Sequence, residues 1–146
     1  HHHFNHVFLD VNLRQNYYSQ SIIKSSLTHA TFVKMSDEEW PVISKLINVS
    51  SIEAMLLEYR LMGVAITKGE NGAELINSQG RSINSGYSAE VIDAVGAGDA
   101  FSAVMAAALI LNIPLKKALD TACKVGAYVV NHAGAQIPLP DELKTM

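Results

Sequence analysis

The residues best placed to do chemistry lie in the stretch VIDAVGAGDAF, residues 91–101, where two glycines and two aspartates precede a small apolar run. The apolar run predicts a helix, so the N–H groups of residues 96–99 lie at a helix start and lack intrahelical partners. Gly96 and Gly98 carry no Cβ, which lets an anion come close to these donors. The helix dipole adds about half a positive charge at the same place.

Asp99 lies in the first turn of the expected helix, where the charged form of a carboxylate is stabilised. A carboxylate at this position can accept a proton beside a bound phosphate, as phosphoryl transfer requires. The alternative, for these four residues alone, is a tight glycine turn followed by an acidic helix start. Both interpretations stay open until the rest of the chain is considered.

Two common phosphate-binding patterns do not fit the chain. G-x-x-x-x-G-K-[ST] is absent, because no Gly-Lys pair occurs in the sequence. The dinucleotide pattern G-x-G-x-x-G fits only its first two glycines, because Phe101 occupies the third glycine position. Asp120 follows about twenty residues on, but within an expected helix and not at a strand end. A nicotinamide-dependent oxidoreductase is therefore the weaker interpretation.

Strand and helix patterns alternate in the segments that must position these residues. Strands are expected at 6–12, 31–35, 63–69, 72–77 and 80–84, and helices at 19–30, 42–47, 51–62, 97–111 and 115–132. In the first helix, Ile22, Ile23 and Leu27 are expected on one apolar face, and Pro114 opens the last helix. This order favours one α/β domain with a parallel sheet covered by helices.

Composition narrows the classes of protein further. The 146 residues are 49% hydrophobic and 17% charged, which suits one packed domain. A net charge of −3 gives no basic surface for nucleic acid or anionic lipid. The single cysteine and the lack of a long apolar stretch favour the cytoplasm. His1, His2 and His3 are interpreted as the remnant of an affinity tag.

The segment DAVGAGDAF, residues 93–101, resembles the C-terminal signature D-[TA]-x-G-A-G-D of the ribokinase-like (PfkB) carbohydrate kinases. DVNLR (10–14) is similar to a strand-end segment of fructokinase-like members, and TKGENG (67–72) to the nucleotide loop T-x-G-x-x-G. HAGAQ (132–136) is similar to the closing segment, where a cation-binding loop passes. The four segments occur in family order, and the resemblance implies a three-layer α/β/α ribokinase-like (Rossmann-like) fold with a mainly parallel sheet.

The resemblance also implies roles for the matching residues. Asp99 matches the catalytic base that takes the proton from the sugar hydroxyl. The anion hole for the transferred γ-phosphoryl group matches the turn formed by Gly96, Ala97, Gly98 and the amide of Asp99. The residues that border ATP match Thr67, Lys68, Gly69, Glu70, Asn71, Gly72 and Gly98. Cys123 falls where the family contacts adenine, although a small buried apolar side chain is the favoured alternative.

Metal sites are implied in the same way. Asp93, with backbone carbonyls near Val95, Val130 and Ala133, matches the monovalent-cation site of many members, so K⁺ is a candidate beside ATP and Mg²⁺.

The family often carries N-x-x-E, which organises water around Mg²⁺, whereas this chain has SDEE. Glu39 is carried over as a metal-shell residue, and Ser36 replaces the asparagine. The same spacing is that of a capping box, although Pro41 would then fall in the second turn of the helix. Arg14 could face the nucleotide phosphates, or it could be a solvated strand-end residue.

Length is the largest departure, because family members are much longer and nothing here resembles their N-terminal sugar pocket and lid. Residues 4–146 are therefore interpreted as the nucleotide-binding C-terminal part of an ATP-dependent sugar kinase, inactive by itself. Its open sheet edge would be covered by self-association or by an N-terminal portion. The alternatives are a catalytically incomplete ATP-binding module and a kinase for a nucleoside or another small hydroxyl compound. The expected partners are ATP and a small sugar, not nucleic acid or membrane.

Overall fold

The computed structural model describes residues 5–134 and 137–144, which form two compact units. Unit 1 contains the chain up to Thr67 and the segment Leu75–Arg81. Unit 2 contains the segment Lys68–Glu74 and the chain from Ser82 onward. The expected tag remnant, and the last two residues of the segment 132–136, lie outside the described residues.

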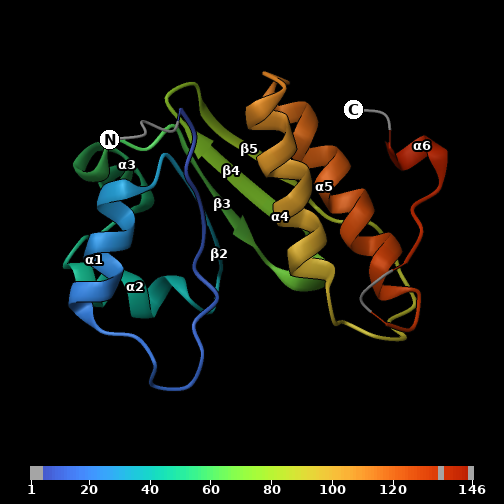
Figure 1. Ribbon diagram of the computed structural model, residues 1–146, viewed down its shortest axis with the longest axis horizontal. Coiled ribbons are helices and arrows are strands. Elements are labelled where there is room, and N and C mark those ends of the chain that lie inside the picture. The colour runs from blue at the N-terminus through green and yellow to red at the C-terminus, as the bar shows by residue number, and fades with distance from the viewer. Residues whose placement is uncertain (1–4, 135–136, 145–146) are drawn as a thin grey trace. The chain divides into compact units, whose positions relative to one another are not determined.

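All five strands contribute residues to unit 1, in the spatial order β1-β2-β3-β4-β5. The strands are β1 (Phe8–Asp10), β2 (Phe32–Ser36), β3 (Gly63–Thr67), β4 (Ala73–Asn77) and β5 (Gly80–Asn84). The pairs β1–β2 and β2–β3 are parallel, so the expected parallel sheet is confirmed for these strands (Figure 1). β1 pairs only with β2, which leaves its other edge open among the described residues.

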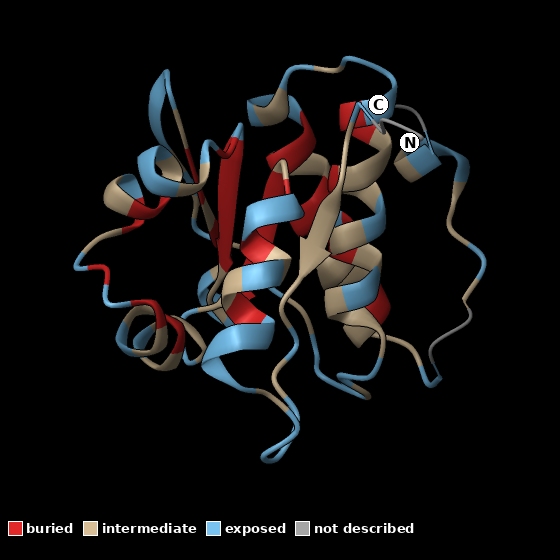
Figure 2. Ribbon diagram, turned by 60° about the vertical axis from the view of Figure 1, so that its left-hand side comes forward, coloured by how far each residue is buried: buried red, intermediate tan, exposed pale blue. Residues whose placement is uncertain are grey.

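Three helices pack against the strands of unit 1: α1 (Gln20–His29), α2 (Trp40–Ile47) and α3 (Ile52–Tyr59). The core between them joins apolar side chains of the strands to those of the helices. Its members include Leu27 of α1, Val33 and Met35 of β2, Ile43 of α2, Met55 of α3 and Val64 of β3. Figure 2 marks the buried stretches of the ribbon in red.

The expected apolar face of α1 is right for two of its three residues. Ile23 and Leu27 are buried, but Ile22 is 54% exposed. The helix begins after Ser19, whose hydroxyl accepts a hydrogen bond from the Ile22 N–H at 3.3 Å. Residues four apart on a helix share a face, whereas the immediate neighbour of Ile23 is turned by about 100°.

The second face of the same strands carries a different set of side chains. Phe8 and Phe32 stack with ring centroids 5.3 Å apart. Gly63 is paired with Phe32 in the sheet, and a Cβ at Gly63 would come within 2.8 Å of the Phe32 ring. The aromatic pair therefore needs glycine at this position of β3. Asp10, Lys34 and the other polar residues of this face follow toward the carboxyl ends of the strands.

Unit 2 is built on two helices that lie side by side, α4 (Ala97–Ile110) and α5 (Leu115–Val130) (Figure 1). Pro114 is the N-cap of α5, as expected, and the helix ends two residues before the predicted boundary. A single 3-10 turn, η1 (Gly69–Asn71), precedes β4. The short helix α6 (Asp141–Lys144) has no counterpart in the sequence-based expectation.

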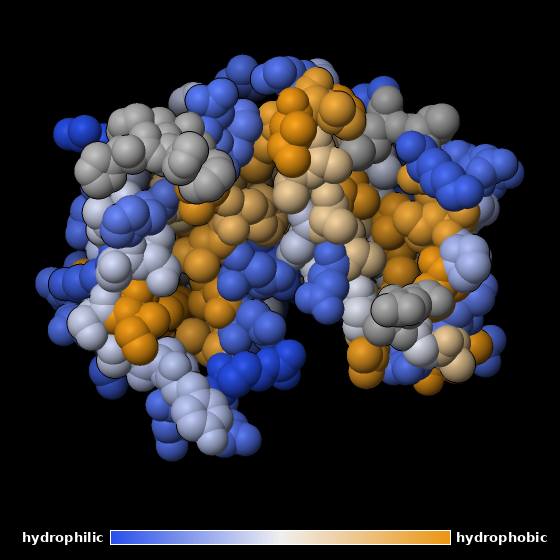
Figure 3. All heavy atoms as spheres, in the orientation of Figure 1, coloured by the Kyte–Doolittle hydropathy of each residue, from blue (hydrophilic) through white to orange (hydrophobic). Residues whose placement is uncertain are grey.

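The surface retains several large apolar side chains, and Figure 3 shows apolar patches among polar ones. The most exposed are Leu57, Tyr17, Ile110, Ile83, Val91 and Val95. Within the described residues, none of the helices has the length and apolar character needed to cross a membrane.

Candidate active site

The start of α4 has the open geometry that its glycines predicted. Gly96 is the N-cap residue, with φ 86°, a left-handed conformation that glycine adopts at no steric cost. No side chain caps this helix start, and the N–H groups of Gly98 and Asp99 donate no hydrogen bond to any described residue. Asp99 is exposed in the first turn. The turn Gly96–Asp99 thus presents backbone donors beside a solvent-facing carboxylate.

Within the predicted nucleotide loop, residues 67–72, the part Lys68–Gly72 is a short closed turn in unit 2. The Lys68 N–H donates to the Gly72 carbonyl at 2.8 Å, and the Asn71 N–H donates to the Lys68 carbonyl at 3.0 Å. Gly69, Glu70 and Asn71 are exposed. The Lys68 ammonium forms an ion pair with Glu74, which links the first residue of the loop to the start of β4.

Gly72 and Gly86 hold this loop against the segment 84–87. A Cβ at Gly72 would lie 2.1 Å from the Asn84 carbonyl oxygen and 2.3 Å from the Gly86 nitrogen. A Cβ at Gly86 would lie 2.6 Å from the Glu70 carbonyl oxygen. Both glycines also have positive φ, 79° and 86°. The two segments touch backbone to backbone, and any side chain at either position would separate them.

Asp93 ties two predicted cation-site segments together. Its Oδ1 accepts the Val95 N–H at 2.9 Å and its Oδ2 accepts the Gly134 N–H at 3.1 Å. These hydrogen bonds, that of Val95 first, lower the pKa of Asp93. The Val130 carbonyl accepts the N–H groups of Ile92 and Asp93 at 2.8 and 3.2 Å. The structure thus brings together Asp93, Val95, Val130 and the neighbour of Ala133.

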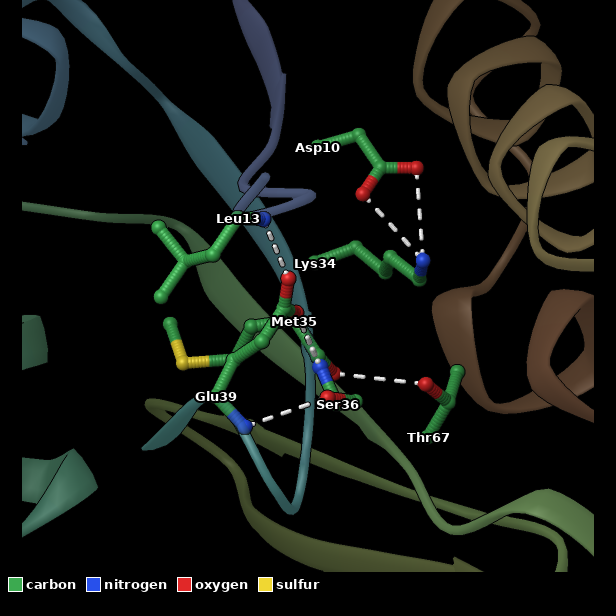
Figure 4. A network of polar contacts seen from close by, with 7 residues as sticks. All are labelled: Asp10, Leu13, Lys34, Met35, Ser36, Glu39 and Thr67. Atoms are coloured by element: carbon green, nitrogen blue, oxygen red, sulfur yellow. Dashed lines mark hydrogen bonds and ion pairs between the residues drawn. The ribbon is translucent and has the colours of Figure 1, made fainter. Parts of the chain in front are cut away.

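Ser36 and Glu39 form the reciprocal hydrogen bonds of a capping box (Figure 4). The Ser36 hydroxyl accepts the Glu39 N–H at 3.1 Å, and Glu39 Oε2 accepts the Ser36 N–H at 2.8 Å. Glu39 Oε1 accepts the Leu13 N–H at 2.6 Å. The helix proper begins only at Trp40, so Pro41 falls in its first turn, where no N–H partner is lost.

The strand ends of unit 1 carry a second polar group (Figure 4). Asp10 on β1 is the register partner of Lys34 on β2. The Lys34 ammonium, on a residue that is 8% exposed, donates to both carboxylate oxygens of Asp10, at 3.1 and 3.3 Å. The Thr67 hydroxyl donates to the Met35 carbonyl at 3.4 Å. The side chain of Thr67 therefore reinforces the β2–β3 pair. Carboxyl ends of parallel strands are where ligands bind in open α/β sheets.

Cys123 is a buried residue of α5. Burial, together with the charge of Asp120, raises the pKa of its thiol to about 11, so the thiol is protonated at neutral pH. This environment suits a small apolar packing group, the alternative that the sequence favoured. Its predicted contact with adenine stays a prediction.

Arg14 lies on the rim of a cavity of about 270 Å³ in unit 1. The cavity is lined mostly by apolar side chains of β1, of the segment after it and of α1, including Leu9, Tyr18, Ile23 and Leu27. Arg14 itself is exposed. The solvated strand-end interpretation of Arg14 fits this placement.

Sequence reasoning missed a cluster around Asp120 in unit 2. Asp120 Oδ1 accepts hydrogen bonds from Asn84 Nδ2 at 3.0 Å and from the Tyr87 hydroxyl. Its Oδ2 pairs with Lys124 Nζ at 2.8 Å. Only the i, i+4 spacing of Asp120 and Lys124 was visible in the sequence, because the other two partners lie more than thirty residues away.

The donor groups fit a phosphate ligand better than a metal held by the protein alone. Among the described residues, no group of three or more His, Cys, Asp or Glu side chains could hold a metal ion. Mg²⁺ commonly binds through one or two carboxylates, water and substrate phosphates. Each Glu39 oxygen accepts one backbone hydrogen bond and keeps a lone pair for a metal-bound water.

Comparison with known proteins shows which family shares this α/β fold. Residues 1–142 match the pfkB family of carbohydrate kinases. Fructokinase from Escherichia coli is 30% identical over 92% of this chain and 48% of its own length. A nucleoside kinase from Methanocaldococcus jannaschii, described as an archaeal member of the ribokinase family, superposes with a TM-score of 0.85 at 26% identity, over 96% of this chain and 47% of its own.

A double mutant of fructokinase from Vibrio cholerae, solved with fructose, ADP and potassium ion, has a TM-score of 0.72 at 28% identity. The match covers 89% of this chain and 46% of that protein. The chain belongs to the pfkB family of carbohydrate kinases and has the ribokinase-like α/β fold. It spans about half the length of the relatives that it matches.

Proposed function

We propose that this chain supplies the ATP site, the anion hole and the catalytic base of a kinase that phosphorylates a sugar hydroxyl. The turn Gly96–Asp99 carries the proposal, because it joins uncapped backbone donors to an exposed carboxylate. Phosphoryl transfer is mostly positioning and charge stabilisation, which N–H donors at a helix start supply. Asp99 accepts the proton of the acceptor hydroxyl as the phosphoryl group moves.

The loop Lys68–Gly72, with Thr67 before it, borders the phosphates and ribose of ATP in this proposal. The N–H groups of Lys68, Asn71 and Gly72 close the turn, whereas those of the exposed residues Gly69 and Glu70 donate to no described residue and are available to a ligand. Cys123 contributes packing near the adenine base of ATP. ATP is the phosphoryl donor that membership of a kinase family implies.

The metal ions are assigned by chemistry. Mg²⁺ would be held by the ATP phosphates and by water, with Glu39 accepting hydrogen bonds from that water. K⁺ would lie beside Asp93 and the carbonyls near Val95, Val130 and Ala133, and the Vibrio cholerae relative was solved with potassium ion. When bound, Mg²⁺ neutralises charge on the transferred phosphoryl group.

The variant Gly98→Val tests whether the open turn Gly96–Asp99 binds a phosphate. Its side chain should block an anion at the α4 turn, so ATP affinity measured by calorimetric titration should fall at least about tenfold, the loss of a single charge-assisted hydrogen bond. Thermal unfolding is measured in parallel. Ala103→Val also places a β-branched residue at an accessible position of α4, and it should leave ATP affinity unchanged.

A Gly98→Val protein that unfolds at a lower temperature, yet binds ATP as wild type does when folded, would contradict the phosphate cradle. The glycines would then make only a tight turn.

A nucleoside is the second candidate acceptor. The superposition on the Methanocaldococcus jannaschii nucleoside kinase favours it, since that structure covers nearly all of this chain. The family resemblance implies that the acceptor is recognised by an N-terminal part, and this chain spans about half the length of these relatives. An ATP-binding module without catalysis is the remaining alternative.

The open edge of β1 is where we propose that a partner binds. An N-terminal portion of the kinase, or a second copy of the chain, would pair with this edge. We expect the chain alone to lack sugar-stimulated ATP consumption, because no segment of it resembles the sugar pocket of the family. The composition favours a cytoplasmic setting.

A further inference from the structure

Unit 2 contains a set of contacts that leads from the predicted nucleotide loop to the helix beside the α4 turn. The loop Lys68–Gly72 is exposed over its three central residues, and three backbone hydrogen bonds close it. Such a turn needs outside support to keep one position, because its side chains bury little surface. Its support comes from the segment 84–87.

The segment 84–87 contacts the loop through glycine backbone. Gly72 and Gly86 approach so closely that an added Cβ on either would meet backbone atoms of the other segment at 2.1–2.6 Å. The Gly86 N–H also donates to Asn84 Oδ1 at 2.9 Å, which holds the segment in its turn. Any movement of this segment therefore moves the loop.

Asp120 fixes the segment to α5. Its Oδ1 accepts from Asn84 Nδ2 at 3.0 Å and from the Tyr87 hydroxyl, while its Oδ2 pairs with Lys124 at 2.8 Å. Lys124 Nζ lies 5.5 Å from the centroid of the Tyr87 ring, within the range of a cation–π contact. These four contacts thus lie around the middle of α5, at Asp120 and Lys124.

α5 lies beside α4, and its Gly126 is the point of close approach to the α4 turn. A Cβ at Gly126 would lie 3.8 Å from the carbonyl oxygen of Ala97, an ordinary van der Waals contact. The connection therefore runs from loop 68–72 through Asn84 and Asp120 to α5, and along α5 to the start of α4. All of these residues belong to unit 2.

We propose that Asp120 is a positioning residue that fixes the loop Lys68–Gly72 relative to the turn Gly96–Asp99. The consequence for ligand binding rests on the proposed function: ATP would contact both segments, and Asp120 would keep the distance between them fixed. Asp120 does not touch the ligand. It holds Asn84 and Tyr87, and they hold the loop through Gly86.

Amide hydrogen exchange of the chain without nucleotide tests the connection by itself. In Asp120→Ala, amides of 68–74 and 82–90 should exchange at least about fivefold faster, as expected for loss of half-exposed hydrogen bonds to a carboxylate, while those of 101–109 in α4 stay unchanged. Lys124→Ala keeps both Oδ1 acceptor contacts and should have a smaller effect. Asp141→Ala is the matched control, since Asp141 pairs with Lys144 at 2.8 Å on α6 away from the loop.

Unchanged exchange in Asp120→Ala, or equal acceleration in all segments including 101–109, would overturn the connection. ATP titration supplies the second readout: the dissociation constant should rise about fivefold in Asp120→Ala and stay at the wild-type value in Asp141→Ala. A loosened loop with unchanged ATP affinity would overturn the positioning role. Failure of the wild-type chain to bind ATP would count against the proposed function, while the exchange result would still decide the connection.

Discussion

Two helix starts in this molecule look alike in sequence and differ in structure. At α2, the side chains of Ser36 and Glu39 satisfy the backbone donors of the turn before it, and Glu39 also accepts the Leu13 N–H. At α4, the turn Gly96–Asp99 has no side-chain cap. Both contain a carboxylate three residues after the first position of the motif.

The difference shows where an acidic residue at a helix start serves folding and where it is free for a ligand. Glu39 is half-buried, and each of its oxygens is engaged by a backbone donor. Asp99 is exposed, and its own N–H and that of Gly98 donate to no described residue. A helix start left open in this way costs stability, and the cost is offset when an anion binds.

The largest effect is expected for Asp99→Asn, which leaves the shape of the open turn intact and removes the base. Turnover of the intact kinase should fall by about 10²–10⁴, the usual loss when a general base is removed. ATP affinity and the temperature of unfolding should change little, because Asp99 is exposed and its side chain caps no backbone donor of the described helix start. Steady-state kinetics with separate kcat and KM values measure this, and near wild-type kcat would remove Asp99 from the role of base.

Glu39→Ala should have the opposite profile. Because it leaves the backbone donors of Leu13 and Ser36 without their acceptor, we expect a loss of about 1–3 kcal/mol in the free energy of unfolding. Urea denaturation of the chain measures the loss. Glu39→Gln keeps one acceptor oxygen and should lose less.

An unchanged midpoint in Glu39→Ala would break the comparison, because the turn would then be closed by something other than this carboxylate. A change confined to the Mg²⁺ dependence of ATP binding would instead assign Glu39 chiefly to the metal.

Local patterns predicted much of the fold because their causes are local. Apolar residues at helical spacing located α1 and α3, and glycines marked the α4 turn. The prediction that Ile22 is buried was wrong, because successive residues of a helix point in directions about 100° apart, so the neighbour of a buried residue can be exposed. The four-residue α6 is too short to give a period.

Long-range contacts could not be predicted in the same way. The hydrogen bond from Leu13 to Glu39 joins residues 26 apart, and that from Asn84 to Asp120 joins residues 36 apart. Nothing in either segment signals its partner, because the pairing depends on how the strands and helices pack. The S-x-x-E spacing did predict its hydrogen bonds, but Pro41 moved the helix start to Trp40.

The smallest effect is expected for Ser36, where the chain departs from the family pattern N-x-x-E. Ser36→Ala removes the acceptor of the Glu39 N–H and should cost about 1 kcal/mol in the free energy of unfolding, as for other lost helix caps. Ser36→Asn restores the family residue and should stay within about 0.5 kcal/mol of wild type, because asparagine caps as well as serine does. Urea denaturation of both variants, beside ATP titration at several Mg²⁺ concentrations, separates the two roles. If Ser36→Asn leaves stability unchanged but tightens Mg²⁺-dependent ATP binding severalfold, the turn before α2 is also part of the metal shell. The two helix starts would then differ only in whether their backbone donors are satisfied, and not in whether they take part in ligand binding.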